Sequence, residues 1–245
     1  MIPAITKEQF QELEEHGYFL LEDVFTPAEM DDLAGWIEAH QHRHEEAIKA
    51  QGGTQGISRA EEITFTSHLA ENDDNIRDFV TRPEFVAITT PILGPDVDLY
   101  WNQSVFKMPD GESEFPWHQD SGYTDVIPSP YLTLWLAIND ATTENGCISV
   151  IPGSHKRGLV PHEKTSIGLS CHSLNDPDQG IQVPVKAGSI AVFYSLTLHK
   201  SGVNRSKGPR KAYVIQYSVS ELRDAYTGEI LTGKIPLARQ NHAVA

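Results

Sequence analysis

Residues 131–138 read Tyr131-Leu132-Thr133-Leu134-Trp135-Leu136-Ala137-Ile138, a short run rich in β-branched and aromatic residues that predicts a strand. Similar short runs lie on both sides of it in the sequence, and Gly, Pro and Asn separate them. These runs are residues 99–106, 148–151, 181–185, 189–194 and 212–219. Many short strands at such spacing predict a β-sandwich or a β-barrel.

The residues before the strands have helical signals. Thr6 is followed three residues later by Gln9, a capping-box pattern that predicts a helix ending at Gly17. Thr26 and Pro27 predict the start of a second helix that extends into the 40s. We further expect a buried strand at 17–21, a loop at 50–59 and a short helix near 83–93.

No linker separates the helical part from the strands, so the 245 residues predict one domain. We expect a helical N-terminal part over about 1–95 and a β core over about 96–220. The expected class is therefore mainly β with flanking helices (α+β). Residues 156–180 are loop-like in composition.

Composition and charge restrict the partners. With 19 Lys and Arg against 34 Asp and Glu, the net charge is −15, which argues against nucleic acid and against an anionic membrane surface. Cys147 and Cys171 form no CxxC motif, so neither a disulfide framework nor a thiolate zinc site is expected. No stretch approaches 18 apolar residues and residues 1–8 contain no signal-peptide core, so a cytoplasmic protein is the expectation.

The first candidate for chemistry is the pair His118 and Asp120 in Pro116-Trp117-His118-Gln119-Asp120. In an extended strand, residues two apart point to the same face, so the two side chains would converge. Two imidazoles and one carboxylate on one face of a metal are typical of non-haem Fe(II) oxygenases. A His-x-Asp pair alone is weak evidence, and a third ligand must come from elsewhere.

His199 follows the predicted strand 189–194 and is the candidate third ligand. The segment 204–209 has strong turn composition, which predicts a hairpin that places Arg210 across from His199. A guanidinium there could bind the far carboxylate of a metal-chelated diacid in a bidentate way. Ser201 shares the face of His199 and could add a hydroxyl to the same carboxylate.

Several ordered motifs between about residues 10 and 220 resemble the phytanoyl-CoA dioxygenase family. They are Phe106-Lys107-Met108-Pro109, residues 115–123, Leu134-Trp135-Leu136-Ala137, residues 144–155, and His199 with Arg210. Their joint occurrence is far more specific than the His-x-Asp pair.

The resemblance implies a double-stranded β-helix, also called a jelly roll or cupin-like fold. It implies that His118, Asp120 and His199 bind Fe(II) and form the catalytic centre, and that O₂ is consumed. It also implies 2-oxoglutarate as cosubstrate, bound by Arg210 with the help of Ser201, Trp135, Lys107 and Gln103. Halogenases of this family have a small residue in place of the carboxylate, so Asp120 favours hydroxylation.

Two alternatives remain open at this point. One is a jelly-roll isomerase or hydrolase that uses the same three ligands with Zn²⁺ or Mn²⁺ and no 2-oxoacid. The other is a non-catalytic binding protein that has kept the fold. The expected partner is a small-molecule metabolite, and the sequence predicts no oligomeric state.

Overall fold

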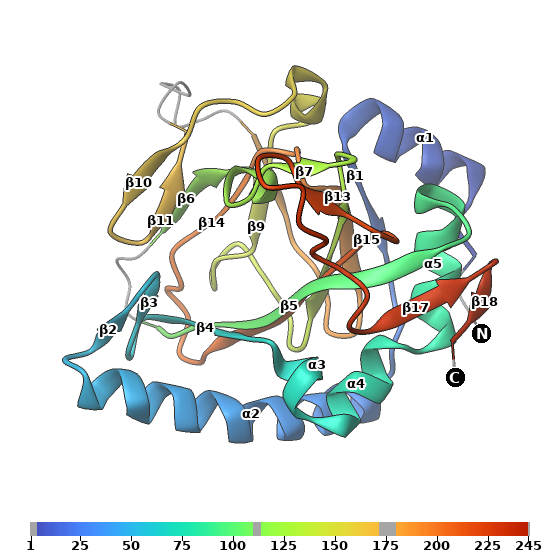
Figure 1. Cartoon of the computed structure of the whole chain (residues 1–245). Helices are drawn as coiled ribbons and strands as arrows, with labels where there is room; N and C mark the ends of the chain where they lie inside the picture. Colours follow the sequence, from blue (N-terminus) through green and yellow to red (C-terminus); the bar gives the residue numbers. More distant parts are fainter. Residues whose placement is uncertain (1–3, 110–113, 172–179, 245) are drawn as a thin grey trace.

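A computed structural model describes residues 4–109, 114–171 and 180–244 (Figure 1). The α-helices are α1 (Lys7–His16), α2 (Pro27–Ala50), α3 (Leu69–Asn72), α4 (Asp74–Val80) and α5 (Pro83–Leu93). Two 3₁₀ turns cover Asp120–Gly122 and Ser154–Arg157. Within these residues, no helix is both long and apolar enough to cross a bilayer.

In the described part of the chain, the larger sheet has ten antiparallel strands. Eight follow one another in the order β1 (Tyr18–Leu21), β13 (Ile190–Tyr194), β8 (Leu132–Ala137), β15 (Arg210–Val219), β5 (Val97–Lys107), β4 (Ile63–Ser67), β3 (Ser58–Arg59) and β2 (Thr54–Gln55). β17 (Pro236–Arg239) also pairs with β5, and β18 (His242–Ala243) pairs with β17.

A smaller antiparallel sheet faces it. Its order is β12 (Ile181–Val183), β9 (Ile148–Val150), β14 (His199–Ser201) and β6 (Phe115–His118). Two short antiparallel pairs complete the described strands, the hairpin of β10 (Glu163–Thr165) with β11 (Gly168–Ser170) and the long-range pair of β7 (Val126–Ile127) with β16 (Arg223–Asp224). Two facing antiparallel sheets confirm the mainly β fold with flanking helices and the jelly-roll core.

The side chains of β8 contribute to two separate hydrophobic cores. Its residues alternate in direction because successive side chains in a strand point to opposite faces. Leu132, Leu134 and Leu136 pack in the cluster that contains the helices, and Trp135 and Ala137 pack between the sheets. Each buried Leu contributes about 1.5–3 kcal/mol of transfer free energy. The stretch is buried on both faces, which explains its nearly continuous apolar run.

The helices cover the outer face of the larger sheet (Figure 1). α1 has the predicted capping box at Thr6 and ends at Gly17, whose φ of 85° lies in the left-handed region that glycine adopts without strain. α2 has the same box between Thr26 and Glu29. Both helices and the strand between them therefore confirm the predictions.

Several predictions about organisation were wrong. β4 joins the larger sheet from inside the part predicted to be helical, and β17 joins it from beyond residue 220. The predicted loops contain the short strands β2 and β3 and the pair β10 and β11. Part of the loop-like segment 156–180 lies outside the described residues.

Candidate metal centre

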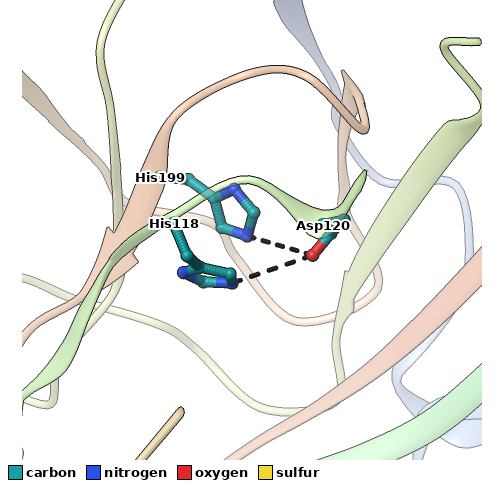
Figure 2. Close-up of side chains that lie close together, drawn as sticks. All are labelled: His118, Asp120 and His199. Atoms are coloured by element: carbon teal, nitrogen blue, oxygen red, sulfur yellow. Dashed lines mark ion pairs between the residues drawn. The ribbon is translucent and has the colours of Figure 1, made fainter. Parts of the chain in front are cut away.

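The smaller sheet brings two histidines face to face. His118 is the last residue of β6, His199 is the first of β14, and the two are direct partners in the strand register. Their ring centroids are 4.1 Å apart. Asp120 faces both rings, with its Oδ1 3.7 Å from His118 Nε2 and 3.6 Å from His199 Nε2 (Figure 2). The three ligand atoms all lie within 4.8 Å of one another.

Asp120 reaches this position differently from the prediction. Asp120 does not lie on the strand with His118 but begins a 3₁₀ turn. The residue between them, Gln119, has an extended backbone. The side chain of Gln119 accepts a hydrogen bond from Val160 N and donates to Gly158 O and Leu196 O. These bonds hold the chain where it leaves β6. The predicted convergence of His118 and Asp120 is therefore confirmed, but the prediction that both lie on one extended strand was wrong.

Backbone carbonyls fix which nitrogen of each histidine faces the centre. His118 Nδ1 lies 2.9 Å from Pro116 O, and His199 Nδ1 lies 2.9 Å from Thr197 O. A carbonyl can only accept, so each Nδ1 carries a proton, and a neutral ring in this orientation offers the lone pair of Nε2 to a metal. Burial and the neighbouring His199 hold the pKa of His118 well below its usual value, which favours the neutral ligand form.

Asp120 is fixed in a similar way. Thr133 donates to its Oδ2 over 2.6 Å, and Gln216 donates to the Thr133 hydroxyl over 3.3 Å. Only Oδ1 then faces the two imidazoles. Two neutral imidazole nitrogens and one carboxylate oxygen on one side form the donor set that suits non-haem Fe(II) and leaves other positions open.

A cavity of about 510 Å³ lies between the sheets and contains the three donors on its wall. Arg210 also lines it, with a side chain that is 1% exposed. Its Nε and Nη1 form no hydrogen bond, and the guanidinium lies 5.2 Å from the centre of the Trp135 ring. Burial lowers its pKa to about 10, so it remains a cation. A buried cation with unpaired donors is a strong binding site for a carboxylate.

The predicted hairpin between His199 and Arg210 was wrong. β14 pairs with β6 and β9 in the smaller sheet, whereas β15, which begins at Arg210, pairs with β5 and β8 in the larger sheet. The connecting segment therefore crosses from one sheet to the other. Both residues nevertheless reach the same cavity, because that cavity lies between the two sheets.

Seven of the eight predicted site residues line this cavity. They are His118, Asp120, His199, Arg210, Ser201, Trp135 and Gln103. Lys107 lies behind Ser201, with its Nζ 3.2 Å from Ser201 Oγ and 2.5 Å from Gly202 O. The structure thus brings all eight together without assigning a role to Lys107.

The sequence did not single out Thr133, Gln216 or the cavity-lining rings of Tyr100, Trp101 and Tyr131. Thr133 lies two residues before Trp135 on a strand that was predicted, so strand alternation alone could have placed it on the cavity side. Its pairing with Asp120 depends on the turn at 120–122 and had no signal in the sequence.

Comparison with known proteins decides the family. The family profile described as phytanoyl-CoA dioxygenase (PhyH) matches residues 13–212. The chain belongs to the phytanoyl-CoA dioxygenase family. Among its relatives, the peroxisomal phytanoyl-CoA dioxygenase of Bos taurus is 25% identical over 233 residues, which are 85% of this chain and 67% of the relative. The methylphosphonate hydroxylase of Gimesia maris is 25% identical over 229 residues, which are 92% of this chain and 86% of the relative.

Solved structures share the fold. The non-haem alpha-ketoglutarate-dependent carbocyclase SnoK from nogalamycin biosynthesis superposes with a TM-score of 0.74 at 22% identity and covers 94% of this chain and 95% of its own. EvdO2 from Micromonospora carbonacea, solved with 2-oxoglutarate, gives 0.72 at 20% identity and covers 94% and 97%. This member of the phytanoyl-CoA dioxygenase family therefore has the jelly-roll fold of these proteins, and its His-Asp-His centre fits iron.

Proposed function

We propose that this chain hydroxylates an unactivated C–H bond of a small metabolite, with Fe(II), O₂ and 2-oxoglutarate. The observation that carries the proposal is the buried, unpaired Arg210 in the same cavity as the three metal donors. The reaction balances as substrate C–H, O₂ and 2-oxoglutarate giving substrate C–OH, succinate and CO₂. The relatives named above support the same chemical class.

The iron, when bound, supplies the activation of O₂. His118, His199 and Asp120 would hold it, and their part is geometric. The carbonyls behind both Nδ1 atoms fix the ring orientations, and Thr133 fixes the carboxylate. Ligands that are held in the correct orientation before the metal binds increase both the affinity for the metal and its reactivity.

Arg210 would bind the C5 carboxylate of 2-oxoglutarate through two parallel hydrogen bonds. Ser201 supports it: Lys107 can only donate, so the Ser201 oxygen accepts from it and keeps its own proton for the cosubstrate. Trp135 provides the face beside the guanidinium. Lys107 is proposed to assist through Ser201. Gln103, which the resemblance also implied for the cosubstrate, lies in register beside Val214, the strand partner of Trp135, and we assign it to the substrate instead.

The cavity walls serve to exclude water. Ile63, Phe65, Val105 and Val214 line it on the larger sheet. In such surroundings the Arg210–carboxylate contact is stronger than in water, and reactive species are protected from side reactions.

The proposed location of the protein is the cytoplasm. Its two buried cysteines are unpaired, which supports a reducing environment.

The test is anaerobic titration of the metal-free protein with Fe(II) and then 2-oxoglutarate. We expect a visible metal-to-ligand charge-transfer band, followed by succinate formation when O₂ and a substrate panel are added. His199→Ala should abolish both, while Lys211→Met on the outer face of β15 should leave both unchanged. Stable Zn²⁺ or Mn²⁺ binding with neither band nor succinate would instead favour the isomerase or hydrolase alternative.

A further inference from the structure

We infer that the substrate of this site is an uncharged, ring-bearing molecule whose carbonyl or hydroxyl oxygen accepts a hydrogen bond from Gln103. The inference rests on the proposed function, because it concerns the space left beside the cosubstrate. Three features of the cavity carry it: its charge, its aromatic end and the orientation of Gln103.

The first feature is the lack of cations for an anionic substrate. Of the 19 Lys and Arg residues, only Arg210 and Lys200 line the cavity in the described part of the chain. The segments 1–3, 110–113, 172–179 and 245 contain no Lys or Arg in their sequence. Arg210 is assigned to the cosubstrate, which leaves Lys200.

Lys200 already forms an ion pair with a carboxylate. Its Nζ lies 3.2 Å from Glu114 Oε2 and 5.5 Å from the centre of the Trp117 ring. A phosphonate, a phosphate or a coenzyme A thioester would thus meet no free cation in this cavity. Placing an anion there would cost desolvation without a compensating ion pair. The cavity therefore favours a neutral molecule over the anions that the names of two relatives imply.

The second feature is the aromatic end of the cavity. Trp101 is the register partner of Gln216, six residues beyond Arg210, so it lies past the middle of β15 and away from Arg210. Tyr100 is adjacent to Trp101 and packs against Tyr131 with ring centroids 4.9 Å apart. Tyr123 adds a fourth ring, 6.0 Å from that of His118 and 46% exposed.

These four aromatic side chains offer rigid apolar faces around the metal centre, and all four line the cavity. Phenols are neutral near pH 7, so these rings add no charge to the cavity. Aromatic walls recognise flat or ring-bearing ligands by stacking and edge contacts. A cavity of this size takes a ligand of drug-like dimensions.

The third feature is Gln103. Its Oε1 accepts from Trp101 Nε1 over 3.2 Å and from Ser67 Oγ over 3.4 Å. An indole N–H is a donor only, so the atom it meets must be the carboxamide oxygen. The opposite atom, Nε2, forms no hydrogen bond with the residues that the structure describes, and the side chain lines the cavity. Gln103 can therefore present only N–H donors to a ligand.

His68 stabilises this arrangement from behind. Its ring packs edge-on against Trp101, with centroids 4.4 Å apart. A site that presents a fixed donor discriminates strongly against ligands that leave the donor unpaired. An acceptor oxygen near the reacting carbon is thus part of the predicted substrate.

Equilibrium dialysis with three naphthalene probes tests the inference on protein loaded with Fe(II) and 2-oxoglutarate without O₂. The probes are 2-naphthamide (neutral, with an acceptor), 2-naphthoate (anionic, with an acceptor) and 2-ethylnaphthalene (no acceptor). We expect 2-naphthamide to bind at least about tenfold more tightly than either of the others. Equal or tighter binding of 2-naphthoate, or no binding of 2-naphthamide, overturns the inference.

Two variants separate the features. Gln103→Leu should weaken 2-naphthamide binding by about tenfold, leave 2-ethylnaphthalene unchanged and keep the wild-type affinity for 2-oxoglutarate in the charge-transfer titration. That last measurement also shows that the variant folds. A fall in 2-oxoglutarate affinity would assign Gln103 to the cosubstrate and overturn its role here.

Glu114→Gln should free Lys200 and raise the affinity for 2-naphthoate, while Glu8→Gln on α1 should not. Failure of the proposed function would be visible separately, as the absence of the band in the wild type.

Discussion

The hydroxyl of Thr133 donates a hydrogen bond to Oδ2 of Asp120 over 2.6 Å, so the carboxylate turns only Oδ1 toward the two histidines. Thr133 is fully buried in β8 of the larger sheet, and the turn that begins with Asp120 follows the smaller sheet. One hydrogen bond thus couples the ligand turn to the opposite sheet.

Thr133→Val removes this hydroxyl with little change in shape. We expect the affinity for Fe(II) to fall by about 10–100-fold, because partners behind metal ligands contribute that much. Thr133→Ser keeps the donor and should stay close to the wild type. The measurement is anaerobic Fe(II) titration with 2-oxoglutarate present; equal affinities in Val and wild-type proteins would show that Asp120 needs no such support.

Arg210→Met tests the cosubstrate contact. Loss of a charge-assisted pair should weaken 2-oxoglutarate binding by at least about tenfold. The metal-free, ligand-free variant should be as stable as the wild type or more stable, because an unpaired buried cation disappears. Thermal unfolding with and without 2-oxoglutarate checks both points.

The control for this experiment is Lys211→Met, which replaces the next residue on the opposite face of β15. Lys211 contacts Glu38 rather than the cavity. It should keep the stabilisation that the wild type gains from 2-oxoglutarate. An Arg210 variant that still gains this stabilisation would contradict the assignment.

The features that the sequence predicted correctly are those that local chemistry determines. The capping box at Thr6 and the left-handed Gly17 bound α1 without help from the rest of the fold. The run of 131–138 predicts a strand because both of its faces are apolar. The three metal donors were found through their residue types and spacing, and they converge in the structure.

The errors concern choices between distant partners. Turn residues at 204–209 fit a hairpin, yet Asn204 donates to Lys107 O and to Gly208 O, which directs the chain across to β5. The 3₁₀ turn at Asp120 depends on Gln119 contacts with Gly158 and Leu196, 39 and 77 residues away in the sequence. Periodicity reports which face is buried but not which segment covers it.

Gln119→Met tests whether those distant contacts hold the centre together. Gln119 is fully buried, and the change leaves Gly158 O, Leu196 O and Val160 N without their partner. Unsatisfied buried groups cost about 1–3 kcal/mol each before relaxation, so we expect a loss of about 3 kcal/mol in the free energy of unfolding.

The affinity for Fe(II) should fall in the same variant, because Gln119 separates two of the ligands. Denaturant unfolding and Fe(II) titration measure the two effects, with the exposed Gln11→Met as the control. Lost stability with unchanged Fe(II) affinity would limit Gln119 to a structural role.

The last prediction concerns pH and His162. Its Nε2 accepts from Gln119 N over 3.0 Å, and its Nδ1 lies 2.7 Å from Val160 O, so the ring is bound as the neutral tautomer. Burial lowers the pKa of His162 below the usual 6.5. A lowered pKa means that the unfolded chain takes up the proton first as the pH falls. The stabilisation from His162 is thus fully present above about pH 6.5 and is lost as the pH falls through the folded-state pKa.

We therefore compare the metal-free wild type with His162→Gln by denaturant unfolding between pH 7.5 and pH 5. The difference in the free energy of unfolding should be largest at pH 7.5 and should shrink toward pH 5. Taking the difference removes the effect of the net charge of −15, which both proteins share to within one histidine proton. A difference that stays constant or grows on acidification would mean that His162 is not held neutral against Gln119, and the turn that carries Asp120 would then need another support.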